Sequence, residues 1–333
     1  MKTKFKVYKL HFTTPLHIGD ERDDYSISLK TYQSDAMYAA LTSCLAKIGV
    51  EIPDNGDLGV NISSLFPFYQ KSETDNAVYF LPKLLKVKPP KLEHLNDAKK
   101  VKKVNWIELF YFEKLISGDQ LFEDAHNISQ IKGEFLTSNY IGEQEGFISS
   151  QVSQRVTVSR DFSENAKPFY MDRIYFSDYS GLYFIANGDT KLLDMAMNIL
   201  QHEGIGTDRN IGNGFFTYST DEIEIDLPES DYISNLSMYC PETEIELNTM
   251  LKDKEVAYDF VKRGGWITTM PHNKIRKNTI YMFTPASVFK SKEKSFNLNV
   301  MGKMVDLNPK TTYPLVNHPI WRNGRSLFIP VKI

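Results

Sequence analysis

The stretch GIGTDRNIGNGFF, from residue 204 to residue 216, combines residue types that can bind phosphate groups. Alternating glycines leave backbone N–H groups exposed and let another backbone come close, and an arginine guanidinium offers a fork of donors to phosphate oxygens. A single-stranded nucleic acid backbone suits such a surface. The candidate RNA-binding residues in this stretch are Gly204, Gly206, Arg209, Asn210, Gly212 and Gly214.

Neither of the two common nucleotide-binding loops fits this stretch. A dinucleotide fingerprint needs GxGxxG between a strand and a helix, but Arg209 occupies the third glycine position and the stretch follows a predicted helix. A P-loop needs lysine and then serine or threonine after its last glycine, whereas Asn213 and Gly214 follow Gly212. A helix C-cap followed by a β-bulge would explain only one or two of the four glycines.

A second candidate site lies in RVTVSRDFSENAKPFYMDRIYF, where Arg155 and Arg160 stand five positions apart. The alternation predicts a charged β-hairpin, from about residue 150 to 178, that need not be buried on both faces and can project. Arginine and aromatic residues on such a ribbon can wedge between bases and hold the flanking phosphates. The alternative is two surface arginines in ion pairs with Asp161 or Glu164.

A third candidate site consists of Arg263, Gly264, Gly265 and Trp266. A cation, two permissive backbone units and an indole in a row can stack a base and bind its phosphate. The same residues also suit a plain turn followed by a core tryptophan, so the sequence leaves both interpretations open. His318 and Arg322 in HPIWRNG have weaker support, because that motif also suits a turn before the last strand.

His17 is the side chain that most suggests catalysis, because histidine can act as a general acid or base. The sequence places no second base beside it, so a hydrogen bond to RNA or within the fold is the favoured role. Four acidic residues, Glu21, Asp23, Asp24 and Asp35, could hold Mg²⁺, but Asp35 can cap a helix instead. The only cysteines, Cys44 and Cys240, lack metal-binding spacing, so we expect neither a metal nor a cofactor.

The elements that position these residues begin with a strand at residues 5–12 and a helix from Ser34, capped by Ser34 or Asp35 and ended by Gly49. A short helix is expected between Asn105 and Gly118. Later come a strand at 181–186, a helix at 190–203, and a strand after the glycine-rich loop at 204–214. The pattern predicts a βαββαβ domain over residues 1–227 and a second, irregular domain over 228–333.

Net charge of −3 gives the chain no overall attraction to nucleic acid, so a polyanion site must be local. One local excess runs from Lys83 to Lys103, where eight lysines stand against Glu93 and Asp97; its ordinary interpretation is a solvated loop. No run of about 18 apolar residues predicts a membrane helix. We expect a cytoplasmic protein without a membrane partner.

These stretches together resemble the RAMP superfamily of CRISPR proteins, whose members carry a glycine-rich loop after the second helix of an RRM-like fold. Within it, the chain is most similar to the family of the fourth subunit of type III-A (Csm) effector complexes. The supporting stretches follow in the family's order over nearly the whole chain: TPLHIG, YQSDAMYAAL, KKVKKVNWIELFYFEKLISG, the hairpin, VKRGGWI, FTPASVF and HPIWRNG. Two departures are DFSENA after Arg160, where the family often has Thr-Gly, and Ala286, where it has glycine.

The resemblance implies an α+β fold with two ferredoxin-like (RRM-like) domains, a projecting β-hairpin and a glycine-rich loop. It implies a non-catalytic subunit in antiviral defence that binds the 5′ tag of the CRISPR RNA, caps the filament of RAMP backbone subunits and docks the large polymerase-like subunit. The resemblance implies that target RNA is only an indirect partner of this subunit. With this resemblance we favour RNA contact for Arg155 and Arg160. The alternative is a metal-independent endoribonuclease that processes precursor CRISPR RNA, with His17 as its acid or base.

Overall fold

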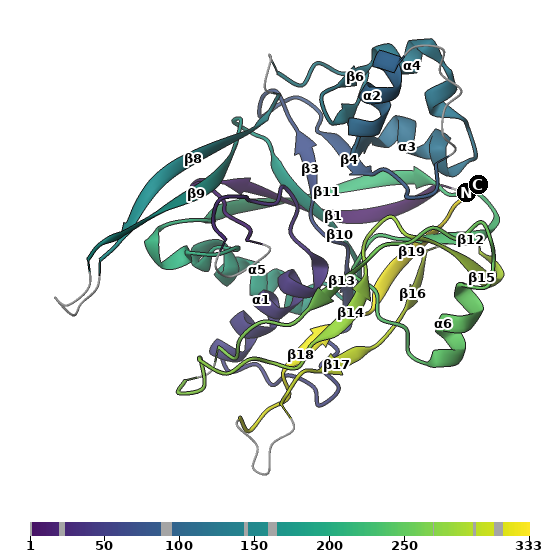
Figure 1. The fold of residues 1–333 in the computed structure, drawn as a ribbon. Coiled ribbons are helices and arrows are strands. Elements are labelled where there is room, and N and C mark those ends of the chain that lie inside the picture. The colour runs from purple at the N-terminus through teal and green to yellow at the C-terminus, as the bar shows by residue number, and fades with distance from the viewer. Residues whose placement is uncertain are drawn as a thin grey trace.

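The structure, a computed structural model, describes residues 2–19, 24–87, 95–142, 146–158, 165–268, 270–295, 298–309 and 316–333. It is a mixed α+β fold with several sheets and few helices (Figure 1). Within these residues the largest sheet has nine strands, in the order β11-β1-β10-β3-β4-β5-β7-β6 with β2 beside β10. Its strands are β1 (Lys2–Phe12), β2 (Val60–Ile62), β3 (Phe66–Tyr69), β4 (Val78–Pro82), β5 (Trp106–Glu108), β6 (Ile131–Lys132), β7 (Phe135–Leu136), β10 (Gly181–Gly188) and β11 (Phe216–Asp226).

Strand β1 is the centre of the first half of the chain. It pairs antiparallel with β10 on one side and along its whole length with β11 on the other. Because it is central, residues on both of its faces are buried, including Val7 on one face and Tyr8 and Leu10 on the other. The predicted first strand and the predicted strand after the glycine-rich loop therefore lie side by side.

Helices α1 (Ser34–Lys47) and α5 (Lys191–Glu203) pack against each other beside this sheet, and Lys6 of β1 reaches the Asp194 carboxylate of α5 at 3.4 Å. Both predicted helices are confirmed, and each ends at a glycine with positive φ: Gly49 at 79° and Gly204 at 74°. The predicted capping of α1 is wrong. Gln33 precedes the helix without a side-chain cap, and the Asp35 carboxylate is used elsewhere.

The segment between β4 and β8 forms a helical insertion with α2 (Leu95–Lys103), α3 (Leu109–Ile116), the 3₁₀ turn η1 (Leu121–Glu123) and α4 (Ala125–Ser129). The helix expected from Asn105 begins four residues later, because Trp106 and Ile107 pair with β4 as strand β5. Pairing with a neighbouring strand overrides local helix propensity here.

Strands β8 (Ile148–Thr157) and β9 (Lys167–Phe176) pair antiparallel, and Figure 1 shows this ribbon extending away from the rest of the molecule. Its base is fixed to the body by backbone hydrogen bonds between Leu16 and Ile174 in both directions, at 2.9 and 2.8 Å. Arg155 belongs to β8, whereas Arg160 lies outside the described residues.

The second half of the chain contains a four-stranded antiparallel sheet with the order β15-β12-β19-β16. Its elements, with two ribbons and one helix, are β12 (Ser230–Asn235), α6 (Glu244–Met250), β13 (Phe260–Arg263), β14 (Ile280–Phe283), β15 (Val288–Ser295), β16 (Asn299–Met301), β17 (Met304–Asp306), β18 (Trp321–Asn323) and β19 (Ser326–Pro330). This order differs from the ferredoxin-like one predicted for this half, in which the first strand lies beside the third and fourth. Here β12, the first strand of the sheet, lies beside β15 and β19, the second and the last.

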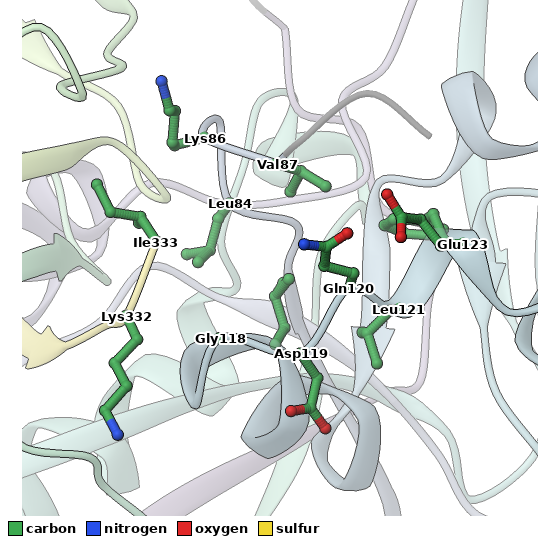
Figure 2. Close-up of a pocket in the computed structure, with 12 residues that line it drawn as sticks. Leu84, Lys86, Val87, Gly118, Asp119, Gln120, Leu121, Glu123, Lys332 and Ile333 are labelled. Atoms are coloured by element: carbon green, nitrogen blue, oxygen red, sulfur yellow. The ribbon is translucent and has the colours of Figure 1, made fainter. Parts of the chain in front are cut away.

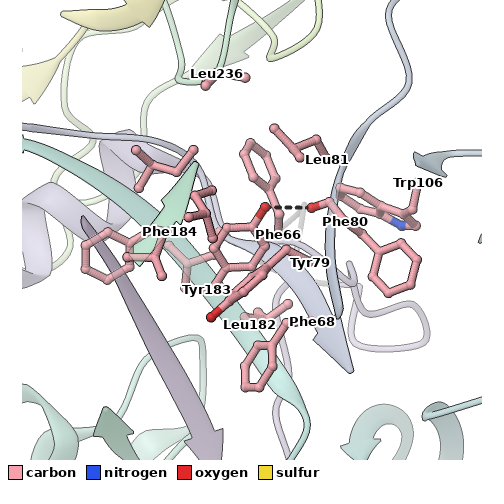
Figure 3. Close-up of a cluster of buried hydrophobic side chains, with 14 of the residues drawn as sticks. Phe66, Phe68, Tyr79, Phe80, Leu81, Trp106, Leu182, Tyr183, Phe184 and Leu236 are labelled. Atoms are coloured by element: carbon pink, nitrogen blue, oxygen red, sulfur yellow. Dashed lines mark hydrogen bonds between the residues drawn. The ribbon is translucent and has the colours of Figure 1, made fainter. Parts of the chain in front are cut away.

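The two halves share one hydrophobic core. Leu236, Leu327 and Ile329 of the second half belong to the same buried cluster as the large sheet. Figure 3 shows the aromatic centre of this cluster, where the Tyr183 hydroxyl donates to the Phe80 carbonyl at 3.0 Å. The shared core fixes the second half beside α1, so residues distant in sequence can meet at one surface.

Candidate nucleic-acid interface

The glycine-rich loop packs on the segment that follows β1. The Gly214 amide donates to the Pro15 carbonyl at 2.8 Å, and the Thr207 amide donates to the His17 carbonyl at 2.9 Å. Within the loop, the Ile205 amide donates to the Gly214 carbonyl at 3.0 Å. The loop is therefore tied to the end of β1 on one side and closed on itself on the other.

All four glycines have positive φ, but they serve different purposes. A Cβ on Gly214 would lie 1.9 Å from the Ile205 carbonyl oxygen, one on Gly206 would lie 2.4 Å from the His17 oxygen, and one on Gly204 would lie 2.9 Å from the Gly214 oxygen. These three glycines admit the chain's own backbone. Only Gly212 has no atom within 4 Å of the added position, so it is the glycine of this loop that is open to an outside chain.

The outer edge of the loop is the 3₁₀ turn η2 (Arg209–Ile211), where Arg209 and Asn210 are exposed. The Arg209 side chain is 46% exposed and lies 4.0 Å from a Glu203 carboxylate oxygen. The same Glu203 carboxylate forms an ion pair with Lys47, whose Nζ lies 2.6 Å from Oε2. Arg209 Nη1 also donates a long hydrogen bond to the Gly204 carbonyl, at 3.4 Å. Because both contacts are long and the carboxylate is shared with Lys47, the guanidinium can still take up a phosphate.

His17 supports the loop and the hairpin from below. Its side chain is 1% exposed, and Nδ1 lies 2.7 Å from the carbonyl oxygen of Asp172 in β9. Its own carbonyl accepts the Thr207 amide of the loop. His17 therefore joins the base of the hairpin, through its imidazole, to the loop, through its backbone carbonyl, and the buried ring is not presented to the surface.

An aromatic ladder links His17 to the hairpin. The Tyr25 ring stacks on His17 with centroids 5.7 Å apart, and it contacts the Phe169 ring of β9 at 5.4 Å. Arg155 stands directly opposite Phe169 in the strand register, so its side chain leaves the same face. Tyr25 and Phe169 were not predicted from the sequence. The pairing of Arg155 with Phe169 depends on where the hairpin turns, and the alternation of residues does not locate that turn.

Arg263 is not a free cation, contrary to the expectation for the third candidate site. Its Nε and Nη2 donate to the two oxygens of Asp35 at 2.9 and 3.1 Å. Arg322 donates to the same carboxylate at 2.7 Å and to the Gly264 carbonyl at 2.6 Å. Asp35 is 0% exposed, so two arginines from the second half of the chain hold one buried carboxylate of α1.

The rest of the third site is partly open. Gly265 has a φ of 116° and no atom near an added Cβ, whereas the Trp266 ring lies under the Arg276 guanidinium at 5.0 Å. Stacking with a cation inside the chain makes the indole less available for a base than expected. Burial, followed by the charge of Arg322, lowers the pKa of Lys277 to about 8.

Tyr32 joins the first and third sites. Burial raises the pKa of its phenol, while the charges of Arg209 and Arg263 and the backbone of Gly206 act in the opposite direction. The glycine-rich loop and the Asp35 cluster therefore both lie near this side chain. Arg209 and Arg263, predicted from stretches 54 residues apart, thus lie in one region of the structure.

No group of three or more possible metal ligands occurs among the residues that the structure describes. Asp24 accepts hydrogen bonds from Ser26, and Glu21 and Asp23 lie outside the described residues. Both cysteines are free thiols. No helix in the described part of the chain is long and apolar enough to cross a membrane.

A separate small pocket lies where the C-terminal Lys332 and Ile333 approach the turn from Gly118 to Leu121 (Figure 2). Its volume of about 40 Å³ is close to the space of one or two water molecules. It is too small for a nucleotide, and it lies on the side of the helical insertion.

Residues 228–331 match the family model described as the CRISPR Csm4 C-terminal domain. Two curated relatives named CRISPR system Cms protein Csm4 match most of the chain. The protein from Thermococcus onnurineus is 25% identical over 252 residues, covering 70% of this chain and 75% of its own length. The protein from Methanocaldococcus jannaschii is 22% identical over 272 residues, covering 72% of this chain and 65% of its own length.

Solved structures share the fold at low sequence identity. The Csm3–Csm4 subcomplex of the type III-A interference complex matches with a TM-score of 0.59 and 15% identity, covering 99% of this chain and 100% of the other. A Csm1–Csm4 cassette in complex with cA4 matches with a TM-score of 0.57 and 18% identity, covering 99% of both chains. The matched C-terminal domain, the curated relatives and the shared fold all make this chain similar to Csm4 subunits of type III CRISPR complexes.

Proposed function

We propose that this chain is a non-catalytic subunit of a type III-A CRISPR ribonucleoprotein and that it binds the 5′ tag of the CRISPR RNA. The observation that carries the proposal is the convergence around His17, where the glycine-rich loop, Tyr25 and the base of the hairpin meet. Arg209 and Arg155 supply cations at the two sides of this surface, and Phe169 supplies a ring. Phosphate contacts and ring stacking are the two means by which proteins hold single-stranded RNA.

We also propose the assembly and domain arrangement that the family suggests. The chain would cap the filament of RAMP backbone subunits and dock the large polymerase-like subunit, because its fold matches proteins solved as Csm3–Csm4 and Csm1–Csm4 assemblies. The first domain, residues 1–227, would be ferredoxin-like and carry most of the RNA surface. The second, residues 228–333, would fix the first through the Asp35 cluster.

Replacing Arg155 or Arg209 by alanine is expected to weaken binding of a labelled tag RNA by about 3- to 10-fold each, as the loss of one phosphate contact does. The slope of log affinity against log salt should fall by roughly 0.7 per lost contact. Fluorescence anisotropy over a salt series measures both quantities. Lys2→Ala serves as the control, because Lys2 lies at the far end of β1 and pairs with Glu224 at 3.5 Å. Unchanged slopes in both arginine variants would contradict the proposed surface.

The processing-nuclease alternative is tested by His17. Because its imidazole is buried and bonded to the Asp172 carbonyl, it is not placed to exchange protons with a substrate. We expect the purified chain to leave labelled precursor CRISPR RNA intact in EDTA, and His17→Ala to lower stability without changing that result. Metal-independent cleavage by the wild type that is lost in His17→Ala, at a temperature where the variant stays folded, would favour the nuclease instead.

A further inference from the structure

A second basic surface lies beside α2, away from the glycine-rich loop. It is a groove of about 730 Å³ whose lining includes the four lysines Lys30, Lys102, Lys103 and Lys132 and the carboxylate of Glu134. The lysines come from three separate segments: the loop before α1, the last turn of α2 and strand β6. Three segments that converge on one groove with a strong excess of cations make a local polyanion site, although the whole chain is slightly acidic.

The cations of this groove are only partly neutralised. Lys30 pairs with Glu134, whereas the Lys132 ammonium donates to the Asn139 carbonyl and forms no ion pair with a residue in the described part of the chain. Lys102 and Lys103 are exposed and form no ion pair with any residue that the structure describes. Val101, which is buried, anchors this turn of α2 and orients both lysines outward.

Part of the groove's lining is bare backbone. Gly133 and Gly146 have positive φ, and a Cβ added to either would meet no atom within 4 Å. A sugar–phosphate chain can therefore approach the backbone there while the lysines bind its phosphates. Phe135 and Ile148 are buried side chains that form an apolar floor.

The groove borders the surface proposed above for the RNA tag. Lys30 lies on the segment between Tyr25, which stacks on His17, and Tyr32, which adjoins Gly206. Ile148, which also lines the groove, is the first residue of β8 and so of the hairpin that carries Arg155. This continuity favours nucleic acid over an acidic protein segment, because the same strand can pass from one surface to the other.

We propose that the groove binds the sugar–phosphate backbone of an RNA segment that extends beyond the stretch held at the glycine-rich loop. The proposal rests on the proposed function for the choice of RNA, but its residues are different. The test compares Lys102→Ala/Lys103→Ala with Lys99→Ala/Lys100→Ala, which removes the same charge from the same helix at positions that do not line the groove. Glu143 and Glu145, which lie in sequence between the groove residues Gly142 and Gly146 but outside the described residues, are kept as they are in both variants.

The full-length chain is titrated with two labelled single-stranded RNAs, the tag alone and the tag with added flanking nucleotides. We expect Lys102→Ala/Lys103→Ala to bind the longer RNA about 10-fold more weakly at low salt, with a salt slope smaller by roughly 1.4, and to bind the tag as the wild type does. Lys99→Ala/Lys100→Ala should bind both RNAs within about 2-fold of the wild type, because exposed charges off the path contribute little.

Equal affinities and salt slopes for the two double variants would overturn the groove as an RNA site. The proposal would also be overturned if Lys102→Ala/Lys103→Ala bound RNA like the wild type but no longer co-purified with a partner subunit. The groove would then be a protein interface. Failure of the proposed function looks different: Arg155→Ala and Arg209→Ala would then bind the tag normally, whatever the lysine variants do. Circular dichroism melting of each variant separates weakened binding from unfolding.

Discussion

Replacing Asp35 by alanine is expected to lower the free energy of unfolding by about 3 to 5 kcal/mol, which is the usual effect of removing one partner from a buried ion pair. The carboxylate is 0% exposed and holds Arg263 and Arg322 together. Without it, two guanidinium groups would remain close to each other in a region that water reaches poorly. Denaturant unfolding followed by circular dichroism measures the loss.

The control for this prediction is an ion pair of the same chemistry on the surface. Lys4 lies 4.0 Å from Glu222, and the two side chains are 72% and 71% exposed. Lys4→Ala should therefore change the unfolding free energy by no more than about 0.5 kcal/mol. If Asp35→Ala unfolds at the same denaturant concentration as Lys4→Ala, the buried cluster does not hold the two halves of the chain together.

The same cluster predicts how stability depends on pH. Burial raises the pKa of Asp35, but the charges of Arg263 and Arg322 outweigh it and hold that pKa below the ordinary value of 3.8. An unfolded aspartate takes up a proton at a higher pH than the folded one, so the stabilisation is complete above the unfolded pKa. It is lost as the pH falls through the lower pKa of the folded chain. Asp35→Asn should remove this part of the acid dependence.

The sequence predicts an element well when the interactions that form it join residues close together in the chain, and poorly when they join distant ones. The existence of α1 and α5 and their C-terminal ends follow from local chemistry, since a periodic apolar pattern and a terminal glycine are both contained in a short stretch. Strand β5 and the strand order of the second half depend on pairing with distant segments. Alternation reports that a strand exists but not which strand lies beside it.

The candidate site shows the same limit. The glycine-rich loop is recognisable because its glycines are adjacent in sequence, but the partner of Arg263 is 228 residues away. No local spacing distinguishes an arginine that binds a buried carboxylate from one that binds phosphate. Ala286, by contrast, stands where the family pattern has glycine and has a φ of 70°, so the pattern identified a position that requires left-handed backbone.

Gly212 and Gly214 allow the strongest test of whether the glycines of the loop serve internal packing or RNA binding. Gly214→Ala is expected to destabilise the chain by more than about 4 kcal/mol, or to prevent folding, because its Cβ would lie 1.9 Å from a backbone oxygen that cannot move away alone. Gly212→Ala should lower stability by only about 1 to 2 kcal/mol, the strain of a φ of 92° in a residue with a side chain. Thermal melting of the two variants measures this difference.

RNA binding then separates the two purposes that glycine can have in this loop. Gly214 admits the chain's own Ile205 carbonyl, so its substitution should affect binding only through unfolding. Gly212 faces open space beside Arg209, so a methyl group there stands where an RNA backbone would approach. We therefore expect folded Gly212→Ala to bind the tag RNA several-fold more weakly than the wild type. If it binds equally well, the glycine-rich sequence of the loop serves its internal packing, and the cations around it would have to account for RNA recognition on their own.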